Sequence, residues 1–220
     1  MARKKQTSGI ITLEEKIALG FISLFHSVGA GLLIFSKGGI YQIALDLVPI
    51  NLIFTSLVVF KYQDEFNAGF FKFLIVVYLM GVGIEMIGVN YGWLFGPYEY
   101  GAVLGFSIWN TPLLIGVNWV LLCYSVGCFV EFFQIPEWLK WTFSVLLLLV
   151  FDYFMEPIAM KHNFWMWVNG SIPNQNYVGW AITAAIFMYF FRFFSFSKKN
   201  KVAGFVWLIQ LCFFLVQNAF

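Results

Sequence analysis

The segment from Trp141 to Trp167, WTFSVLLLLVFDYFMEPIAMKHNFWMW, contains the two features on which the fold and the site depend. Its first half is a continuous apolar run that is typical of a membrane-crossing helix. Asp152 and Glu156 then follow four residues apart, so both carboxyl groups lie on one face of that helix, near its end. Because an ionisable group inside a bilayer is costly, two acids at this position indicate a functional site.

The composition of the whole chain is that of an integral membrane protein. Of the 220 residues, 61% are hydrophobic and only 11% are charged, whereas soluble domains carry about 25% charged residues. Lysine and arginine do not cluster beside aromatic residues as a nucleic-acid-binding surface requires, so we expect no nucleic-acid partner. Cys123, Cys128 and Cys212 all lie in apolar stretches, which favours packing roles over disulfides or metal binding.

Seven apolar segments predict an all-α integral membrane protein with a bundle of about seven transmembrane helices. A crossing needs about 20 apolar residues, and we expect residues 1–220 to form a single polytopic membrane domain. Pro112 lies inside the fourth segment and predicts a kinked or re-entrant first turn there. The expected spans are residues 17–35, 40–60, 70–89, 103–129, 139–158, 178–196 and 203–219.

The distribution of lysine and arginine predicts a cytoplasmic N-terminus and an extracytoplasmic C-terminus, in the cytoplasmic (inner) membrane. Basic residues concentrate on the cytoplasmic side of membrane proteins. With seven spans, only Lys37 and Lys161 fall outside. An even number of spans would put either the basic N-terminus or the basic loop near residue 199 on the wrong side. The expected cytoplasmic set is Arg3, Lys4, Lys5, Lys16, Lys61, Lys72, Lys140, Arg192, Lys198, Lys199 and Lys201.

With this orientation, four acids from three helices fall in the outer half of the membrane: Asp46, Glu85, Asp152 and Glu156. Their convergence favours a shared site. The alternative is that each acid only hydrogen-bonds to a neighbouring helix and has a structural role. For Asp46 the sequence favours neither the functional nor the structural interpretation. The tryptophan-rich loops on the same side predict a lid over a pocket, although aromatic belts at membrane surfaces have the same composition.

The remaining residue types limit the chemistry. The only histidines are His26 and His162, too few for a membrane di-iron oxygenase. Residues 203–219 contain no lysine for a retinal Schiff base, and no phosphate-binding loop or zinc-protease motif occurs. We therefore expect no metal and no cofactor.

A carboxyl group that keeps its proton in an apolar pocket can protonate an alkene, aromatic faces can stabilise the cation, and a second carboxylate can activate water. These residues permit hydration of an isoprenoid double bond without singling it out.

Four segments resemble the carotenoid biosynthesis membrane-protein family, which includes carotenoid 1,2-hydratases and bisanhydrobacterioruberin hydratases. They are EMIGVNYGWLFGPYEYGAVLG, NTPLLIGVNW, FDYFMEP and FWMWVNGSIPNQNYVGW, within residues 80–185. The chain departs from the family pattern at Glu156, where the family has aspartate, and in VNYGW, where it has a Thr-Gly pair. The matching positions are Glu85, Phe95, Gly96, Tyr98, Tyr100, Pro112, Trp119, Asp152, Glu156, Pro157, Trp165, Trp167, Pro173, Asn176, Gly179 and Trp180.

The resemblance implies a cofactor-independent hydro-lyase. Such an enzyme would add water across the terminal C-1,2 double bond of an acyclic (ψ) carotenoid end group through a tertiary carbocation. The expected catalytic residues are Asp152, Glu156 and Glu85, with the deeper Asp152 as proton donor. The implied partners are the carotenoid substrate, water, membrane lipid and other carotenoid-pathway enzymes. The expected substrate-binding residues are Tyr98, Tyr100, Trp165, Trp167, Asn176, Trp180, Trp93, Asn110 and Asp46.

Two other interpretations remain open at this point. A non-enzymatic membrane subunit that binds or transports an apolar substrate would also carry a small apolar pocket beneath aromatic loops. An isoprenoid isomerase or cyclase would use the same carbocation and lose a proton instead of adding water.

Overall fold

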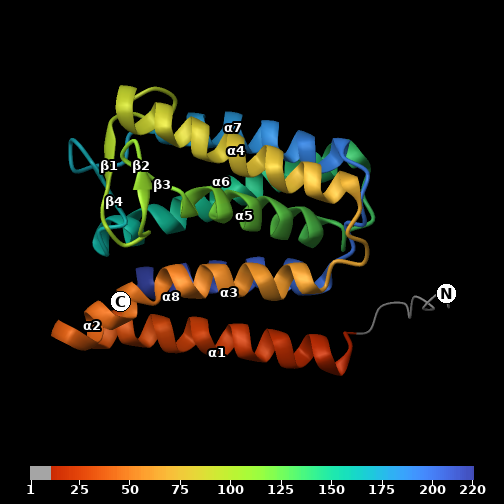
Figure 1. The fold of residues 1–220 in the computed structure, drawn as a ribbon, viewed down its shortest axis with the longest axis horizontal. Coiled ribbons are helices and arrows are strands. Elements are labelled where there is room, and N and C mark those ends of the chain that lie inside the picture. The colour runs from red at the N-terminus through yellow and green to blue at the C-terminus, as the bar shows by residue number, and fades with distance from the viewer. Residues whose placement is uncertain (1–10) are drawn as a thin grey trace.

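The computed structural model describes residues 11–220. Within that range, eight helices form an elongated bundle and four short strands lie at one end of it (Figure 1). The helices are α1 (Leu13–Phe35), α2 (Gly38–Asp46), α3 (Val48–Lys61), α4 (Ala68–Tyr91), α5 (Leu114–Val130), α6 (Glu137–Lys161), α7 (Asn174–Phe193) and α8 (Lys201–Ala219). The strands are β1 (Tyr98–Tyr100), β2 (Ser107–Ile108), β3 (Thr111–Pro112) and β4 (Trp165–Trp167).

Five stretches of the described chain are long and apolar enough to cross a bilayer: Leu13–Phe35, Gly38–Lys61, Ala68–Tyr91, Glu137–Lys161 and Lys201–Ala219. Large apolar side chains on their outer faces are exposed, as a lipid-facing surface requires. This is the pattern of a multi-pass helical membrane protein. The helix α5 has 17 residues, or about 26 Å. Crossings by α5 and α7, and hence the total of seven, stay a prediction.

The second expected span is broken near the strand end of the bundle. Helix α2 ends at Asp46 and α3 begins at Val48, with Leu47 as the junction. Pro49 explains the break, because proline lacks a backbone N–H and its ring clashes with the preceding turn. Pro49 is tolerated in the first turn of α3, because backbone N–H groups in that turn have no carbonyl partner within the helix.

The prediction of a helix from residue 103 was wrong, because α5 begins only at Leu114. Strands β2 and β3 form a hairpin ahead of it, with Trp109 and Asn110 as a two-residue turn. Both turn residues have positive φ angles, 49° and 60°, as tight hairpins favour. Pro112 therefore ends β3 and does not kink a helix.

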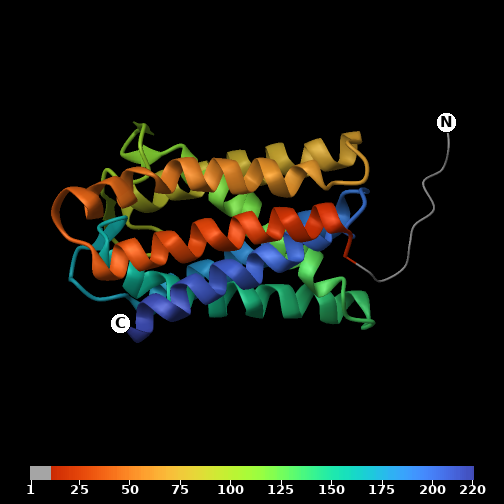
Figure 2. The same ribbon diagram turned by 90° about the horizontal axis from the view of Figure 1, so that it is seen from below.

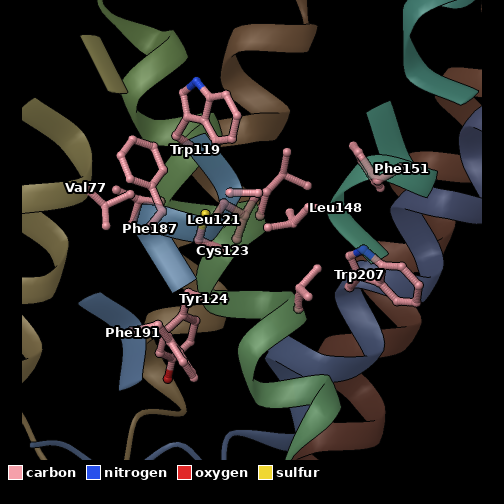
Figure 3. Packing of buried hydrophobic residues seen from close by; sticks show 14 of the residues in the cluster. Val77, Trp119, Leu121, Cys123, Tyr124, Leu148, Phe151, Phe187, Phe191 and Trp207 are labelled. Carbon is pink, nitrogen blue, oxygen red and sulfur yellow. The ribbon is translucent and has the colours of Figure 1, made fainter. Parts of the chain in front are cut away.

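Helix α5 is the centre of the bundle and is buried on every side. Leu121 and Cys123 are fully buried. The indole of Trp119 meets Phe187 of α7 edge to face, with ring centroids 5.3 Å apart, while Trp207 of α8 lies on another side of the helix (Figure 3). A helix covered by protein all round has no lipid-facing stripe, which accounts for its uniformly apolar sequence.

The other helices surround α5 in layers. Helices α4 and α7 lie on one side, α6 and α8 pack against α5, and α1 is outermost (Figure 1). Figure 2 shows α1 running between α3 and α8 when the bundle is seen from below, and its main packing partner is α8. The end with the strands also holds α2 and the C-terminus, whereas α1 begins at the opposite end (Figure 1).

The strand end is closed by a pairing that joins distant parts of the chain. Strands β1 and β4 are antiparallel, with Tyr98 opposite Trp167 and Tyr100 opposite Trp165. The expected loop at residues 161–177 therefore contains a strand, and α7 already begins at Asn174. The two aromatic loops expected to act as a lid form one small sheet.

The element bounds gather most described basic residues at the end away from the strands. Lys37 and Lys161 lie at the strand end, beside α2 and at the end of α6. Arg3, Lys4 and Lys5 lie outside the described residues. The residues at the far end are Lys16, Lys61, Lys72, Lys140, Arg192, Lys198, Lys199 and Lys201.

This asymmetry predicts the orientation of the bundle. A reporter fused after Phe220 should respond as extracytoplasmic, because the basic end should face the cytoplasm. Paired alkaline phosphatase and green fluorescent protein fusions measure this directly. A fluorescent fusion without phosphatase activity would reverse the orientation and put the strand end in the cytoplasm.

The β1–β4 register predicts a specific cross-link. Glu99 lies opposite Met166, and opposed residues in an antiparallel pair have Cα atoms about 4.5–5.5 Å apart, within disulfide range. In a Cys212→Ser background, Glu99→Cys with Met166→Cys should oxidise readily to a disulfide, scored by gel mobility. Glu99→Cys with Val168→Cys is the control, because that diagonal is about 7–8 Å. Equal cross-linking of both pairs would contradict this register.

Candidate active site

Glu85 lies in the last two turns of α4, toward the strand end of the bundle, and is buried. Its Oε1 accepts a hydrogen bond from Trp119 Nε1 at 2.9 Å. Its Oε2 accepts from the Tyr100 hydroxyl at 2.8 Å and also from the Tyr98 hydroxyl. Three aromatic donors from β1 and α5 thus surround one carboxyl group, which compensates for its removal from water.

Two glycines on the same face of α4 make room for these donors. A Cβ atom at Gly88 would lie 2.9 Å from the Tyr98 hydroxyl oxygen. A Cβ atom at Gly81 would lie 3.1 Å from the Trp119 ring. Because positions 81, 85 and 88 share one helix face, the glycines flank Glu85 and let both aromatic rings approach it.

Glu156 receives a matching set of donors at the end of α6. Its Oε2 accepts from Trp165 Nε1 at 3.0 Å and from Trp167 Nε1 at 2.9 Å. The two tryptophans are two residues apart on β4, so both side chains point to the same face of the sheet. The short strand is therefore what directs both indole N–H groups at one carboxylate.

Asn176, in the first turn of α7, joins the two acids of α6. Its Nδ2 donates to Asp152 Oδ2 at 3.0 Å and to Glu156 Oε1 at 3.3 Å. Asp152 and Glu156 are four residues apart on α6, and no lysine or arginine in residues 11–220 forms an ion pair with either acid. Two acids this close in an apolar site cannot both ionise cheaply, so the arrangement favours a proton on one of them.

One carboxyl oxygen of the three acids stands apart. Both oxygens of Glu85 and of Glu156 accept from protein N–H or O–H groups, and so does Oδ2 of Asp152. Asp152 Oδ1 is buried, and no donor among residues 11–220 reaches it. It is therefore the oxygen of the cluster at which a proton can reside and from which it can be donated.

The β1–β4 sheet brings the Glu85 and Glu156 sites into contact. Tyr98, which donates to Glu85, has its ring centroid 5.1 Å from that of Trp167, which donates to Glu156. Tyr100 and Trp165 repeat the arrangement at 6.0 Å. Burial, followed by the nearby Glu85 carboxylate, raises the pKa of Tyr98 and Tyr100 well above the usual range, so both phenols remain donors.

A pair of closely packed, mutually tilted indoles forms another wall of the cluster. Trp180 lies one turn beyond Asn176 on α7, and its ring centroid is 4.2 Å from that of Trp119. Both rings are buried. The electron-rich face of such rings can stabilise a cation.

Three of the expected site residues lie away from the cluster. Asp46 is exposed at the end of α2 and accepts from Gln42 Nε2 at 2.9 Å. The buried face of α2 is formed by Ala44 and Leu45 instead. Trp93 is 66% exposed and packs beside Tyr91. Asn110 lies in the β2–β3 turn and donates to Asn90 Oδ1 at 3.0 Å.

Tyr98, Tyr100, Trp165, Trp167, Asn176 and Trp180 lie in or beside the cluster, as described above. Trp119 was not among the expected site residues. Its signal was present in the sequence, because an indole N–H in an apolar membrane helix needs an acceptor inside the protein. No group of three or more His, Cys, Asp or Glu in the described chain is arranged to hold a metal ion.

A cavity of about 210 Å³ reaches one residue of this cluster, Trp165. It lies between α1, α3, α5, α6 and α8, and its lining is mainly aliphatic and aromatic. Trp165, whose Nε1 is bonded to Glu156, lines the cavity toward the strand end of the bundle. An apolar molecule in the cavity would thus reach the wall of the carboxyl cluster.

Comparison with known proteins gives the same assignment as the motifs. Residues 47–219 match the family described as carotenoid biosynthesis protein. Bisanhydrobacterioruberin hydratase from Haloarcula japonica is 26% identical over 200 residues, covering 77% of this chain and 62% of the relative. The chain therefore spans less than two thirds of the length of that relative. No solved structure matches the chain. Because the family match covers well over half of the sequence, the chain belongs to the carotenoid biosynthesis protein family.

Proposed function

We propose that the protein is an enzyme that hydrates the terminal C-1,2 double bond of an acyclic carotenoid end group. The observation that carries this proposal is the carboxyl pair of Asp152 and Glu156, in which Asp152 Oδ1 alone has no donor. In a multi-pass membrane protein, the apolar substrate would reach the site from the bilayer, and water would reach it from the membrane surface at the strand end.

The first step is protonation of the alkene. Asp152 Oδ1 gives its proton to C-2, and the π electrons of the double bond form the new C–H bond. A tertiary cation remains at C-1. The indoles of Trp165 and Trp167 and the ring of Tyr98 lie beside the pair and stabilise that charge through their faces.

The second step is addition of water. The water oxygen forms a bond to C-1, and the proton it loses passes to a carboxylate of the cluster. Where Glu156 takes this proton, its transfer to the neighbouring Asp152 restores the acid, and the Asn176 amide contacts both carboxyl groups. Glu85 and Glu156, held by their aromatic donors, position the water. The product is a tertiary alcohol, and atoms and charge balance without an oxidant or a reductant.

Substitution of the acids tests these roles. In a host that produces lycopene, Asp152→Asn should lower the yield of hydrated carotenoid by about 10²–10⁴-fold, the contribution typical of a positioned acid. Glu85→Gln should also impair hydration, whereas Glu156→Asp should be mild because the family has aspartate there. The measurement is pigment mass analysis, in which hydration adds one water.

Asp46→Asn is the matched control, since that acid is exposed on α2 and lies outside the cluster; its yield should stay near normal. Near-normal yield from both Asp152→Asn and Glu85→Gln would make the carboxyl cluster structural. A product of unchanged mass but altered absorption would point to isomerisation or cyclisation, and unchanged pigment to binding or transport.

The sequence also predicts that turnover needs no metal, haem, nicotinamide or oxygen, because it contains two histidines and no nucleotide-binding motif. Purified protein should therefore hydrate its substrate under anaerobic conditions and in the presence of EDTA, followed by chromatography of the pigment. If EDTA abolished turnover and an added metal restored it, this prediction would be wrong.

A further inference from the structure

The cavity beside the carboxyl cluster opens toward lipid. Phe25, Val28 and Leu47 line it and are each about half exposed, at 51%, 51% and 47%. They belong to α1 and to the α2–α3 junction, on the outer surface of the bundle. A long apolar molecule can therefore enter sideways from the bilayer, between α1 and α3.

The cavity also holds polar atoms that lack partners. Asn51 Oδ1, Thr55 Oγ1, Gln210 Oε1 and Gln217 Nε2 are buried, and no hydrogen-bond partner in the described chain reaches them. All four residues line the cavity. They account for four of the ten such atoms found in residues 11–220. Because an unpaired buried polar group is destabilising, their concentration in one cavity points to a ligand that pairs with them.

The chemistry of the lining selects a neutral group. No charged residue lines the cavity among the described residues, so a carboxylate or phosphate would lack a counter-ion. His26 Nδ1 donates to the Ile22 carbonyl at 2.8 Å, which leaves Nε2 as an acceptor. Together with the Thr55 hydroxyl and the side-chain amides, it offers both acceptors and donors. A ligand hydroxyl suits this set, because it can donate and accept.

The polar atoms lie at two depths. Gln210 and Gln217 are seven residues apart on α8, which corresponds to about 10 Å. At the outer depth, His162 Nε2 donates to Gln217 Oε1 at 2.7 Å and Nδ1 accepts from the Tyr41 hydroxyl at 2.8 Å. Burial lowers the pKa of His162, so this end is neutral too. Thr55 and Gln210 lie deeper, away from Trp165 and the acids.

We propose that this cavity binds an isoprenoid chain that carries a neutral hydroxyl group, which Thr55, Gln210 and their polar neighbours recognise while the end of the chain reaches Trp165. The isoprenoid nature of the chain rests on the proposed function. The recognition of a hydroxyl rests on the unpaired polar atoms alone. The substrate class is then a hydroxylated isoprenoid, in preference to a pure hydrocarbon.

Equilibrium binding to the purified full-length protein in detergent tests this inference. The probes are radiolabelled geranylgeraniol and the hydrocarbon of the same skeleton, in which hydrogen replaces the hydroxyl. The alcohol should bind more tightly by roughly three- to tenfold, the effect of one or two hydrogen bonds. Thr55→Val and Gln210→Leu should each reduce that preference while hydrocarbon binding stays unchanged.

Thr183→Val is the matched control. Thr183 is also buried with an unpaired hydroxyl, but it lies on α7 and does not line the cavity, so this variant should keep the preference. Equal binding of alcohol and hydrocarbon to the unsubstituted protein, or equal loss in Thr183→Val, would overturn the inference. Displacement of geranylgeraniol by monoolein at equal affinity would assign the cavity to a glycerolipid and overturn its isoprenoid part.

A binding measurement also separates this inference from the proposed function. Asp152→Asn should keep the preference for the alcohol even where hydration is lost. If that preference persists and no hydration occurs in any host, the cavity assignment stands and the hydratase proposal fails. If hydration occurs and the protein shows no preference for the alcohol, the hydratase proposal stands and the cavity assignment fails.

Discussion

Three acids buried in an apolar bundle impose the requirement that shapes this protein: their carboxyl oxygens need hydrogen-bond donors that water does not supply, and in residues 11–220 all of them except Asp152 Oδ1 have one. The donors come from aromatic and amide side chains on four other elements, β1, α5, β4 and α7. Lysine and arginine are not used, so the acids are held without being neutralised by a cation. That leaves a proton as the counter-charge within the Asp152–Glu156 pair, which is the state a general acid requires.

The small β1–β4 sheet follows from that requirement. Tyrosines on β1 donate to Glu85 and tryptophans on β4 donate to Glu156. Alternation along each strand puts all four rings on one face, and the antiparallel register opposes them in pairs. Three residues per strand suffice because the pairing is supported by the bundle beneath. The Asn176 amide then joins α7 to the same site.

The helices and the convergence of Glu85, Asp152 and Glu156 were predictable from the sequence, because long apolar runs and isolated membrane acids are strong local signals. The β1–β4 pair was not, since its short strands are separated in the sequence by α5 and α6. Pro112 was misassigned to a helix because the preceding run is apolar, while the β2–β3 turn depends on backbone angles at Trp109 and Asn110. Asp46 was misplaced because hydropathy does not show which face of α2 is buried, and that face holds Ala44 and Leu45. The cavity depends on how α1 and α3 pack, which hydropathy does not encode.

The central claim is that Asp152 carries the proton of the cluster. Infrared spectroscopy of the purified protein at neutral pH measures this directly, because a protonated carboxyl group in an apolar site has its own C=O stretching band, which shifts in D₂O. The account predicts such a band, its loss in Asp152→Asn and its retention in Asp46→Asn. A spectrum without that band, or a band that persists in Asp152→Asn, would contradict it.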